Sequence, residues 1–542
     1  MGSFTRKGYI VDIAGRNIFY GEVLVEGKRI ASITPLDTEP ADAIPFIMPG
    51  FIDSHVHIES SMLVPSEFAR LAVVHGTVAT VSDPHEIANV CGLEGIRFMI
   101  ANGKTVPFKF FFGAPSCVPA TKFETAGAEI TPDEIKELMQ DPDIHYLSEL
   151  MNYPGVLSGD SEVLLKITHA KMAGKPIDGH APGLRGEDAS RYIAAGISTD
   201  HECVSEDEAI DKLKHGMKIL IREGSAAKNF DALIMLMHEH YRNMMFCSDD
   251  KHPDSLAEGH INQLCARAVS YGVDVFKVLE AACINPVLHY HLDVGTLHVG
   301  DKADFIVVKD LADFIAIETY INGTLVAEDG NSLIEPVDVK AINNFNCNEI
   351  TPDLLQTKLD HRTAIVVNNG QLITGKTSFE PLKEEGNIIP DTGNDILKIC
   401  VINRYNNAAP AVAFIKNFGL KKGAIASSVA HDSHNIVAVG TNDEDLSQAV
   451  NLIIREKGGI SAVGAGEQMF VGLPVAGLMS TEDGYSIADK YIMIDRFVKQ
   501  ILGSKLSAPF MSLSFMALLV IPHLKLSDKG LFDVDTFSLI NT

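Results

Sequence analysis

The amino-acid sequence predicts an α/β protein: a (β/α)8 TIM-like barrel with a small flanking β domain and a C-terminal α/β domain. Three observations support this prediction. Eight apolar segments between residues 50 and 250 alternate with helical segments. Short β-rich runs precede and follow that region. The chain also has 542 residues, which is too long for one hydrophobic core.

The eight apolar segments are the expected barrel strands, and the first of them follows Pro49-Gly50. They are residues 50–58, 77–83, 108–116, 146–152, 176–182, 197–202, 218–225 and 243–250. Strands that alternate with helices at this spacing form parallel βαβ units. Eight such units in roughly 250 residues match the size of a barrel, which we expect at residues 49–292.

Two further domains are expected around the barrel. Residues 1–48 and 293–340 share short β-rich runs separated by turn residues, so we expect them to pair into one composite β-sandwich-like domain. Residues 345–542 have their own strands and helices and should form the C-terminal domain. Its most apolar run, residues 510–526, is interrupted by serine, proline and histidine, which favours a buried core segment over a membrane span.

Charge and cysteine content exclude several classes of partner. The chain has 45 Lys and Arg against 71 Asp and Glu, a net charge of −26. Nucleic acids and anionic membranes require a basic face, so neither is an expected partner. The eight cysteines contain no C-x-x-C pair, and the N-terminus lacks the apolar core of a signal peptide. These features predict a cytoplasmic protein with reduced thiols that acts on a small molecule.

The first expected strand ends in Asp53-Ser54-His55-Val56-His57. Strand side chains alternate between two faces, so His55 and His57 should point in the same direction. Two imidazoles at the carboxyl end of one strand can bind one metal ion. The H-x-H pattern alone is weak evidence, because surface loops often contain it.

The ends of other expected strands supply further ligand-type residues, and barrel enzymes place their chemistry at this end. Together they form a set that we call the six rim residues: His55, His57, Glu149, His180, His201 and Asp249. Four imidazoles and two carboxylates can hold two divalent ions, with Glu149 as the bridge. These ligands suit Mn, Fe or Zn, and no thiolate is placed to favour a softer ion. Two such ions can share a hydroxide, which is a nucleophile at neutral pH.

Three other groups of polar residues are candidates for binding the substrate. The second expected strand is followed by residues that should reach the substrate or support a ligand, with helix capping as the alternative: Asp83, His85 and Glu86. The seventh strand ends in candidates for substrate contact: Arg222, Glu223 and Ser225. In the C-terminal domain, His431 and His434 lie in a polar turn between apolar runs. They have either a role at the barrel mouth or an ordinary solvated position, and neither is counted as a metal ligand.

Several longer motifs are more specific than the opening PGFIDSHVH. They are SSMLVPSEFA (60–69), GTVATVSDPHEIANVCG (76–92), LSELMNYPGV (147–156), DGHAPGL (178–184), STDHE (198–202), CSDDKHP (247–253), SSVAHDSHNIVAVG (427–440) and VGAGEQMFVGLPVAGLMS (463–480). On these motifs the chain resembles the adenine deaminases of the amidohydrolase superfamily over nearly its whole length. The opening motif alone is shared across that superfamily.

The resemblance implies specific roles for the rim residues. His55, His57 and Asp249 would bind one ion, and His180 and His201 the other. The catalytic residues implied are Asp249 and Glu149. Glu149 stands where many superfamily members have a carbamylated lysine bridge, and Asp249 would be both ligand and proton carrier. Asp250 is a rival for proton transfer, although strand alternation should aim it away from the centre.

The resemblance also implies a reaction, cofactors and partners. Hydroxide would attack C6 of adenine while Asp249 moves the proton, releasing hypoxanthine and ammonia in purine salvage. We expect two divalent ions per chain, with Mn²⁺ ahead of Fe²⁺ and Zn²⁺ third, and a homodimer. The alternative is another binuclear amidohydrolase that acts on a different purine, a pteridine or a cyclic amide. A non-catalytic scaffold is disfavoured because it would be free to lose ligands.

Overall fold

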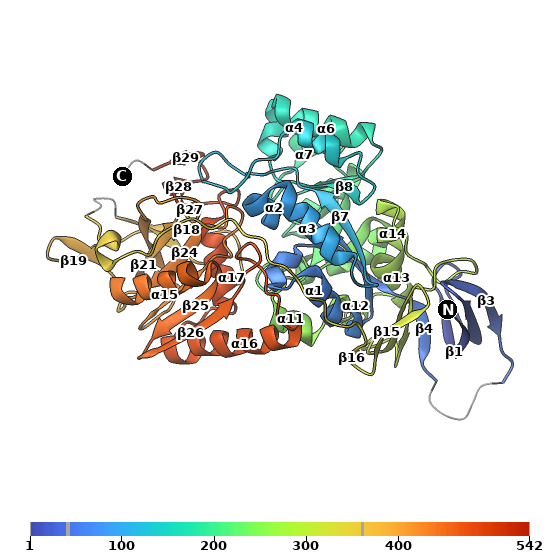
Figure 1. Cartoon of the computed structure of the whole chain (residues 1–542). Helices are drawn as coiled ribbons and strands as arrows, with labels where there is room; N and C mark the ends of the chain where they lie inside the picture. Colours follow the sequence, from blue (N-terminus) through green and yellow to red (C-terminus); the bar gives the residue numbers. More distant parts are fainter. Residues whose placement is uncertain (1, 39–43, 359–361, 541–542) are drawn as a thin grey trace.

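The computed structural model describes residues 2–38, 44–358 and 362–540. Figure 1 shows the barrel region in the middle of the molecule. The sheet that holds the N-terminus lies on one side of the barrel, and the C-terminal domain, drawn in orange and red, lies on the other. Among the described residues, no helix is both long and apolar enough to cross a membrane.

The eight expected barrel strands are present and parallel. They are β5 (Phe51–Val56), β6 (Thr77–Ser82), β7 (Lys109–Ala114), β8 (Ile144–Leu150), β9 (Ile177–Gly179), β10 (Thr199–Asp200), β11 (Lys218–Arg222) and β12 (Met244–Cys247). Hydrogen bonds order them as β5-β6-β7-β8-β9 and β10-β11-β12. At one junction the Ser198 amide donates to the Ile177 carbonyl at 2.9 Å, and at the other the Asp249 amide donates to the His55 carbonyl at 2.9 Å. These bonds close the ring, so the predicted barrel is confirmed.

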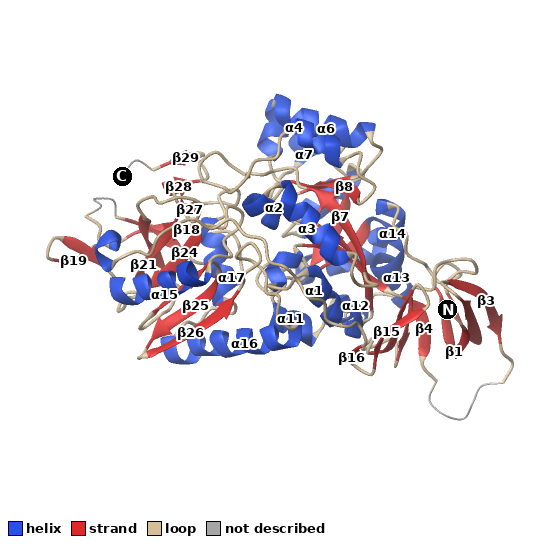
Figure 2. Cartoon of the chain, in the orientation of Figure 1, coloured by secondary structure: helices blue, strands red, loops and turns tan. Residues whose placement is uncertain are grey.

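Helices follow each of these strands and surround them (Figure 2). They are α1 (Pro65–Ala72), α2 (His85–Cys91), α3 (Leu93–Gly103), α4 (Pro132–Leu138), α5 (Tyr153–Ser158), α6 (Ser161–Met172), α7 (Gly186–Ala194), α8 (Glu206–Lys214), α9 (Phe230–Leu233), α10 (Met237–His240), α11 (Pro253–Glu258), α12 (Ile261–Ser270), α13 (Val275–Leu279) and α14 (Asn285–Tyr290). Local sequence explains several helix starts. Thr131 and Glu134 form a reciprocal capping box at α4, for example, with each side chain bonded to the other residue's backbone amide. Since helices cover the barrel from outside, its strands are buried on both faces.

One eight-stranded sheet flanks the barrel. It contains β1 (Ser3–Asp12), β2 (Asn17–Glu26), β3 (Arg29–Pro35), β4 (Phe46–Pro49), β13 (Phe305–Val308), β14 (Ala316–Ile321), β15 (Thr324–Glu328) and β16 (Asn331–Ser332). β4 and β13 pair antiparallel and so join the N-terminal strands to those that follow the barrel. The predicted β-rich runs therefore share one sheet, and β4 leads directly into the first barrel strand.

The C-terminal domain is built on a second eight-stranded sheet, ordered β18-β17-β22-β21-β24-β23-β25-β26. These strands are β17 (Thr363–Val366), β18 (Gly375–Ser378), β21 (Ile396–Ile402), β22 (Ala411–Lys416), β23 (Ala424–Ser427), β24 (Ile436–Gly440), β25 (Gly459–Gly464) and β26 (Glu467–Gly472). Two smaller sheets contain β19 (Leu382–Glu384), β20 (Asn387–Ile389), β27 (Leu524–Ser527), β28 (Gly530–Asp533) and β29 (Ser538–Leu539). The domain's helices are α15 (Asp443–Glu456), α16 (Gly484–Phe497) and α17 (Pro509–Ser514).

Two segments of this domain position the site. Residues 428–435, between β23 and β24, are buried, with exposures of 0–5%. The apolar run that includes α17 is buried as well, from Pro509 to Leu519. Both segments of the C-terminal domain are thus buried in the folded chain.

Candidate active site

The structure brings the six rim residues together at the carboxyl end of the barrel. Each of their side chains is buried, with residue exposures of 0–6%. His55 lies on β5, with His57 just after it, and Glu149 lies on β8. His180, His201 and Asp249 follow β9, β10 and β12, where the strands have already ended. Parallel strands in a closed barrel all end at the same rim, so residues far apart in sequence meet there.

Glu149 occupies the centre of this cluster. Its Oε1 is 3.4 Å from His57 Nε2. Its Oε2 accepts from His180 Nδ1 at 2.8 Å and lies 3.1 Å from His201 Nε2. Burial would raise the pKa of Glu149, but the adjacent His180 and the other two imidazoles outweigh it and lower that pKa well below the usual value. The carboxylate is therefore ionised and faces imidazoles with both of its oxygens.

Asp249 holds the other side of the cluster. Its Oδ1 lies 3.3 Å from His57 Nε2 and 3.6 Å from His55 Nε2. Its Oδ2 accepts from Arg222 Nη1 at 2.7 Å. Burial raises the pKa of Asp249, but Arg222 and then His57 outweigh burial and lower it well below the usual value. One carboxylate oxygen is thus fixed by a cation, while the other faces the imidazoles.

The donor set fits divalent cations. Several groups of its residues have ligand atoms that lie within 4.8 Å of one another. One such group is His55, His57 and Asp249. Neither His55 Nδ1 nor His180 Nε2 has a hydrogen-bond partner within the described part of the chain. Burial, and next the nearby His201 and His57, lower the pKa of His55 well below its usual value. The His55 imidazole is therefore neutral, which is the form that binds metal. At His57, His180 and His201 burial lowers the pKa, but the nearby carboxylates outweigh burial and raise it above the usual value.

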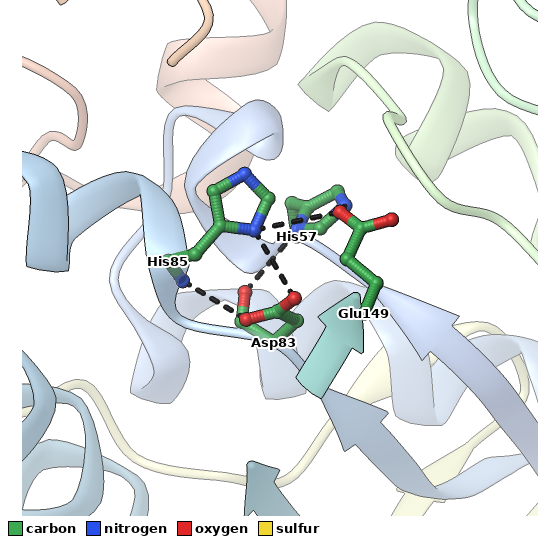
Figure 3. Close-up of side chains that lie close together, drawn as sticks. All are labelled: His57, Asp83, His85 and Glu149. Atoms are coloured by element: carbon green, nitrogen blue, oxygen red, sulfur yellow. Dashed lines mark hydrogen bonds and ion pairs between the residues drawn. The ribbon is translucent and has the colours of Figure 1, made fainter. Parts of the chain in front are cut away.

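Asp83 and His85 lie beside the rim, after β6 and at the start of α2 (Figure 3). His57 Nδ1 donates to the Asp83 carbonyl at 3.2 Å, which turns His57 Nε2 toward Glu149. The Asp83 carboxylate accepts from His85 Nδ1 at 3.1 Å. Asp83 thus orients two imidazoles, whereas His85 and Glu86 line the cavity above the rim.

The C-terminal histidines reach this same cavity through Glu86. His431 Nε2 is 3.0 Å from Glu86 Oε1, and His434 Nε2 bonds Glu86 Oε2. Burial raises the pKa of Glu86, but His431, His434 and His85 outweigh burial and lower it well below the usual value. The turn that contains both histidines is therefore part of the barrel mouth and is not a solvated surface turn.

Two of the predicted substrate contacts at β11 lie elsewhere. Ser225 does not line the cavity, because its hydroxyl accepts from the His252 amide at 2.8 Å and contacts Ser255. Glu223 pairs with Arg267 at 2.9 Å, outside the barrel mouth. The strand ends at Arg222, so the residues after it follow the turn and no longer point along the strand. Arg222 does line the cavity.

Asp250 was expected to face away from the centre, and this expectation is wrong. Its carboxylate lines the cavity, accepts from the Ser60 hydroxyl and lies 3.1 Å from His431 Nε2. β12 ends at Cys247, and Asp249 has a left-handed φ of 54°. Strand alternation therefore no longer applies at this position.

Sequence reasoning missed two carboxylates of the site. Glu202 Oε1 lies 3.5 Å from both His180 Nδ1 and His201 Nε2, and Glu202 Oε2 accepts from Arg222 at 2.9 Å. Asp432 lines the cavity, with Oδ1 3.4 Å from His85 Nε2. Both residues adjoin histidines that had been singled out. That adjacency was the available signal, since neither residue lies within a strand.

Two family models together match most of the chain. Residues 46–326 match the amidohydrolase family, and residues 371–538 match the adenine deaminase C-terminal domain. Proteins named adenine deaminase from Salinibacter ruber and Sulfurovum sp. are each 54% identical, with 99% of both chains covered. The adenine deaminase of Borreliella burgdorferi is 49% identical over 100% of both chains.

The chain belongs to the adenine deaminase family. The family expected from the motifs is thereby confirmed, and the relatives match across barrel and C-terminal domain alike. An adenine deaminase of the amidohydrolase type is a metal-dependent hydrolase that acts on a C–N bond. The buried imidazole and carboxylate groups at the rim are where this chain can hold metal.

Proposed function

We propose that the chain converts adenine and water to hypoxanthine and ammonia, with two divalent ions held by the six rim residues. The observation that best supports this is the position of Glu149. Its two oxygens face different imidazoles, His57 on one side and His180 with His201 on the other. A carboxylate so placed can be shared between two ions. Full-length relatives named adenine deaminase support the choice of substrate.

The proposed ion sites divide the rim residues as follows. His55, His57 and Asp249 would hold one ion, and His180 and His201 would hold the other, with Glu149 available to both. Imidazole and carboxylate ligands favour Mn²⁺ or Fe²⁺, and we propose Mn²⁺ first, with Zn²⁺ after both. When bound, the ions supply Lewis acidity that lowers the pKa of water toward 7.

Asp249 is the proposed proton carrier. The C6 carbon of adenine gains the hydroxyl group of water and loses its amine. The proton that water gives up passes through Asp249 to the amine, which leaves as ammonia. Arg222 fixes one Asp249 oxygen and is itself held by Glu202 through two hydrogen bonds. The second Asp249 oxygen is thereby aimed at the rim in one orientation.

The cavity above the rim is the proposed place of the purine. His85, Glu86 and Asp250 line it from the barrel, and His431 and Asp432 line it from the C-terminal domain. Glu86 is ionised and is held by imidazoles, so it is a rigid acceptor. A site of this kind, enclosed by paired polar groups, discriminates against analogues that leave those groups unpaired. The resulting difference in kcat/KM can reach a factor of roughly 10⁴.

The test is ultraviolet measurement of adenine loss and hypoxanthine formation by Mn-loaded protein, together with ammonia release. Adenosine, cytosine, a pteridine and a cyclic amide are assayed in parallel, and metal-stripped protein is the control. We expect free adenine to be the preferred substrate. If another purine, a pteridine or a cyclic amide is preferred, the alternative binuclear hydrolase is correct. Full activity of the stripped protein would exclude the metal mechanism.

A further inference from the structure

The buried carboxylate of Asp432 has an oxygen that lacks a donor. Asp432 is 3% exposed and lies in the 428–435 segment, which the C-terminal domain inserts into the barrel mouth. Its Oδ1 is 3.4 Å from His85 Nε2. Its Oδ2 has no hydrogen-bond partner in the part of the chain that the structure describes. A buried acceptor without a donor is costly, which indicates that a ligand supplies the donor.

Two carboxyl groups lie near Asp432. One is Glu86, because ligand atoms of His85, Glu86 and Asp432 lie within 4.8 Å of one another. The other is Glu124, whose pKa is raised well above its usual value by burial and next by Asp432 itself. The raised pKa favours the neutral form of Glu124, so the charged carboxylate beside Asp432 is that of Glu86. On the other side, the His85 ring lies between Asp432 and the rim, because its Nδ1 is 3.5 Å from Glu149 Oε1. Asp432 is thus one imidazole ring away from the proposed reaction centre.

We propose that Asp432 Oδ2 accepts a hydrogen bond from the N–H of the five-membered ring of the free purine base. Asp432 then makes the C-terminal domain the part of the protein that selects a base over a nucleoside. This inference rests on the proposed adenine deaminase activity.

The chemistry of adenine selects this contact. In the proposed pose C6 lies at the rim and the five-membered ring points toward Asp432, which lines the same cavity. Along its ring edges, free adenine has one N–H donor, on the five-membered ring, and the remaining ring nitrogens are acceptors. An ionised carboxylate can only accept, so it repels the ring nitrogens that carry lone pairs. The exocyclic amine is the other donor of adenine, and the proposed pose places it at the rim, which leaves the ring N–H for Asp432. A nucleoside has ribose at N9 and no such N–H, so it would leave the Asp432 oxygen unpaired.

The test compares adenine with 9-methyladenine, which lacks the ring N–H. For wild type, Asp432→Ala and Asp432→Asn, we measure kcat/KM for adenine and the inhibition constant of 9-methyladenine against adenine turnover. Asp483→Ala is the matched control, because Asp483 joins the C-terminal domain to the barrel through Arg70 at 2.7 Å without lining the cavity. Metal content and melting temperature are recorded for every variant.

We expect Asp432→Ala to lower kcat/KM for adenine on the order of 10–100-fold, the range for a hydrogen bond to a charged group. The inhibition constant of 9-methyladenine should stay the same or fall, and the loss should appear mainly in KM. Asp432→Asn keeps an acceptor oxygen, so its kcat/KM for adenine should lie between those of Asp432→Ala and wild type. Asp483→Ala should have the wild-type kcat/KM and the wild-type inhibition constant.

Two results would overturn the inference. In the first, Asp432→Ala leaves kcat/KM for adenine unchanged. In the second, it lowers kcat/KM for adenine and raises the inhibition constant of 9-methyladenine by the same factor. If Asp432→Ala loses metal or unfolds, the isosteric Asp432→Asn tests the inference in its place. The same two quantities are compared, kcat/KM for adenine and the inhibition constant of 9-methyladenine. Failure of the proposed function is separate, because it would appear as wild-type protein that releases no ammonia from adenine.

Discussion

Replacing Asp249 with asparagine tests the proposed proton carrier. In the structure one Asp249 oxygen accepts from Arg222 at 2.7 Å, while the other faces His55 and His57. An amide has only one oxygen. If that oxygen turns to Arg222, an NH2 group faces the imidazoles and cannot bind an ion. If it turns to the imidazoles, the NH2 group meets the guanidinium and a charged hydrogen bond is lost, which costs about 1.5–3 kcal/mol.

Either orientation also removes the proton acceptor. We therefore expect Asp249→Asn to lower kcat for adenine by roughly 10²–10⁴-fold. This corresponds to about 3–5 kcal/mol of transition-state stabilisation. The assay is steady-state deamination with metal content measured on the same samples, so that loss of an ion is separated from loss of proton transfer. Asp250→Asn is the matched comparison, because Asp250 contacts Ser60 and His431 and not Arg222.

The expected order is that Asp249→Asn loses more turnover than Asp250→Asn at equal metal content. Near-native turnover of Asp249→Asn, with a large loss in Asp250→Asn, would refute the reasoning. The proton carrier would then be Asp250, which lines the same cavity. A loss of metal together with activity in Asp249→Asn would show that its main role is that of a ligand.

Three further predictions follow from the rim and its supports. His57→Ala and His201→Ala should each lower the metal content below two ions per chain and lower activity with it, as measured by elemental analysis; full activity of a metal-free sample would contradict this. Because Glu149 carries its charge without a carbamate, reconstitution of stripped protein should be equally effective with and without bicarbonate, and a bicarbonate requirement would mean that a lysine bridges the ions. Lys212 is 1% exposed and forms ion pairs with Asp200 and Glu208 at 2.9 Å each. Lys212→Met would leave both carboxylates buried without their cation, so it should lower the free energy of unfolding, measured by urea titration, by about 3–5 kcal/mol. A loss under about 1 kcal/mol would show that these carboxylates are stable unpaired.

The barrel could be predicted because its signal is local and repeated. Each strand is an apolar run with helical segments on both sides, and parallel strands in a barrel end at a common rim. Where the rim residue lies on a strand, as His55 and Glu149 do, its direction follows from alternation. The signal weakens where the strand is short. β10 contains only Thr199 and Asp200, so Glu202 was not assigned to the site although it lies beside His201.

The sequence by itself predicted the eight barrel strands and the six residues that gather at the rim, since spacing and residue type are properties of the chain alone. Only the tertiary structure decided what lies above them. Glu86 is bonded by His434, which is 348 residues away, and Asp432 enters from a separate domain. The left-handed Asp249 turns Asp250 into the cavity, while Ser225 turns out of it. These placements depend on loop conformation and domain packing. Neither leaves a periodic signal in the sequence, because the contacts of a loop residue, and not a repeating pattern, determine its position.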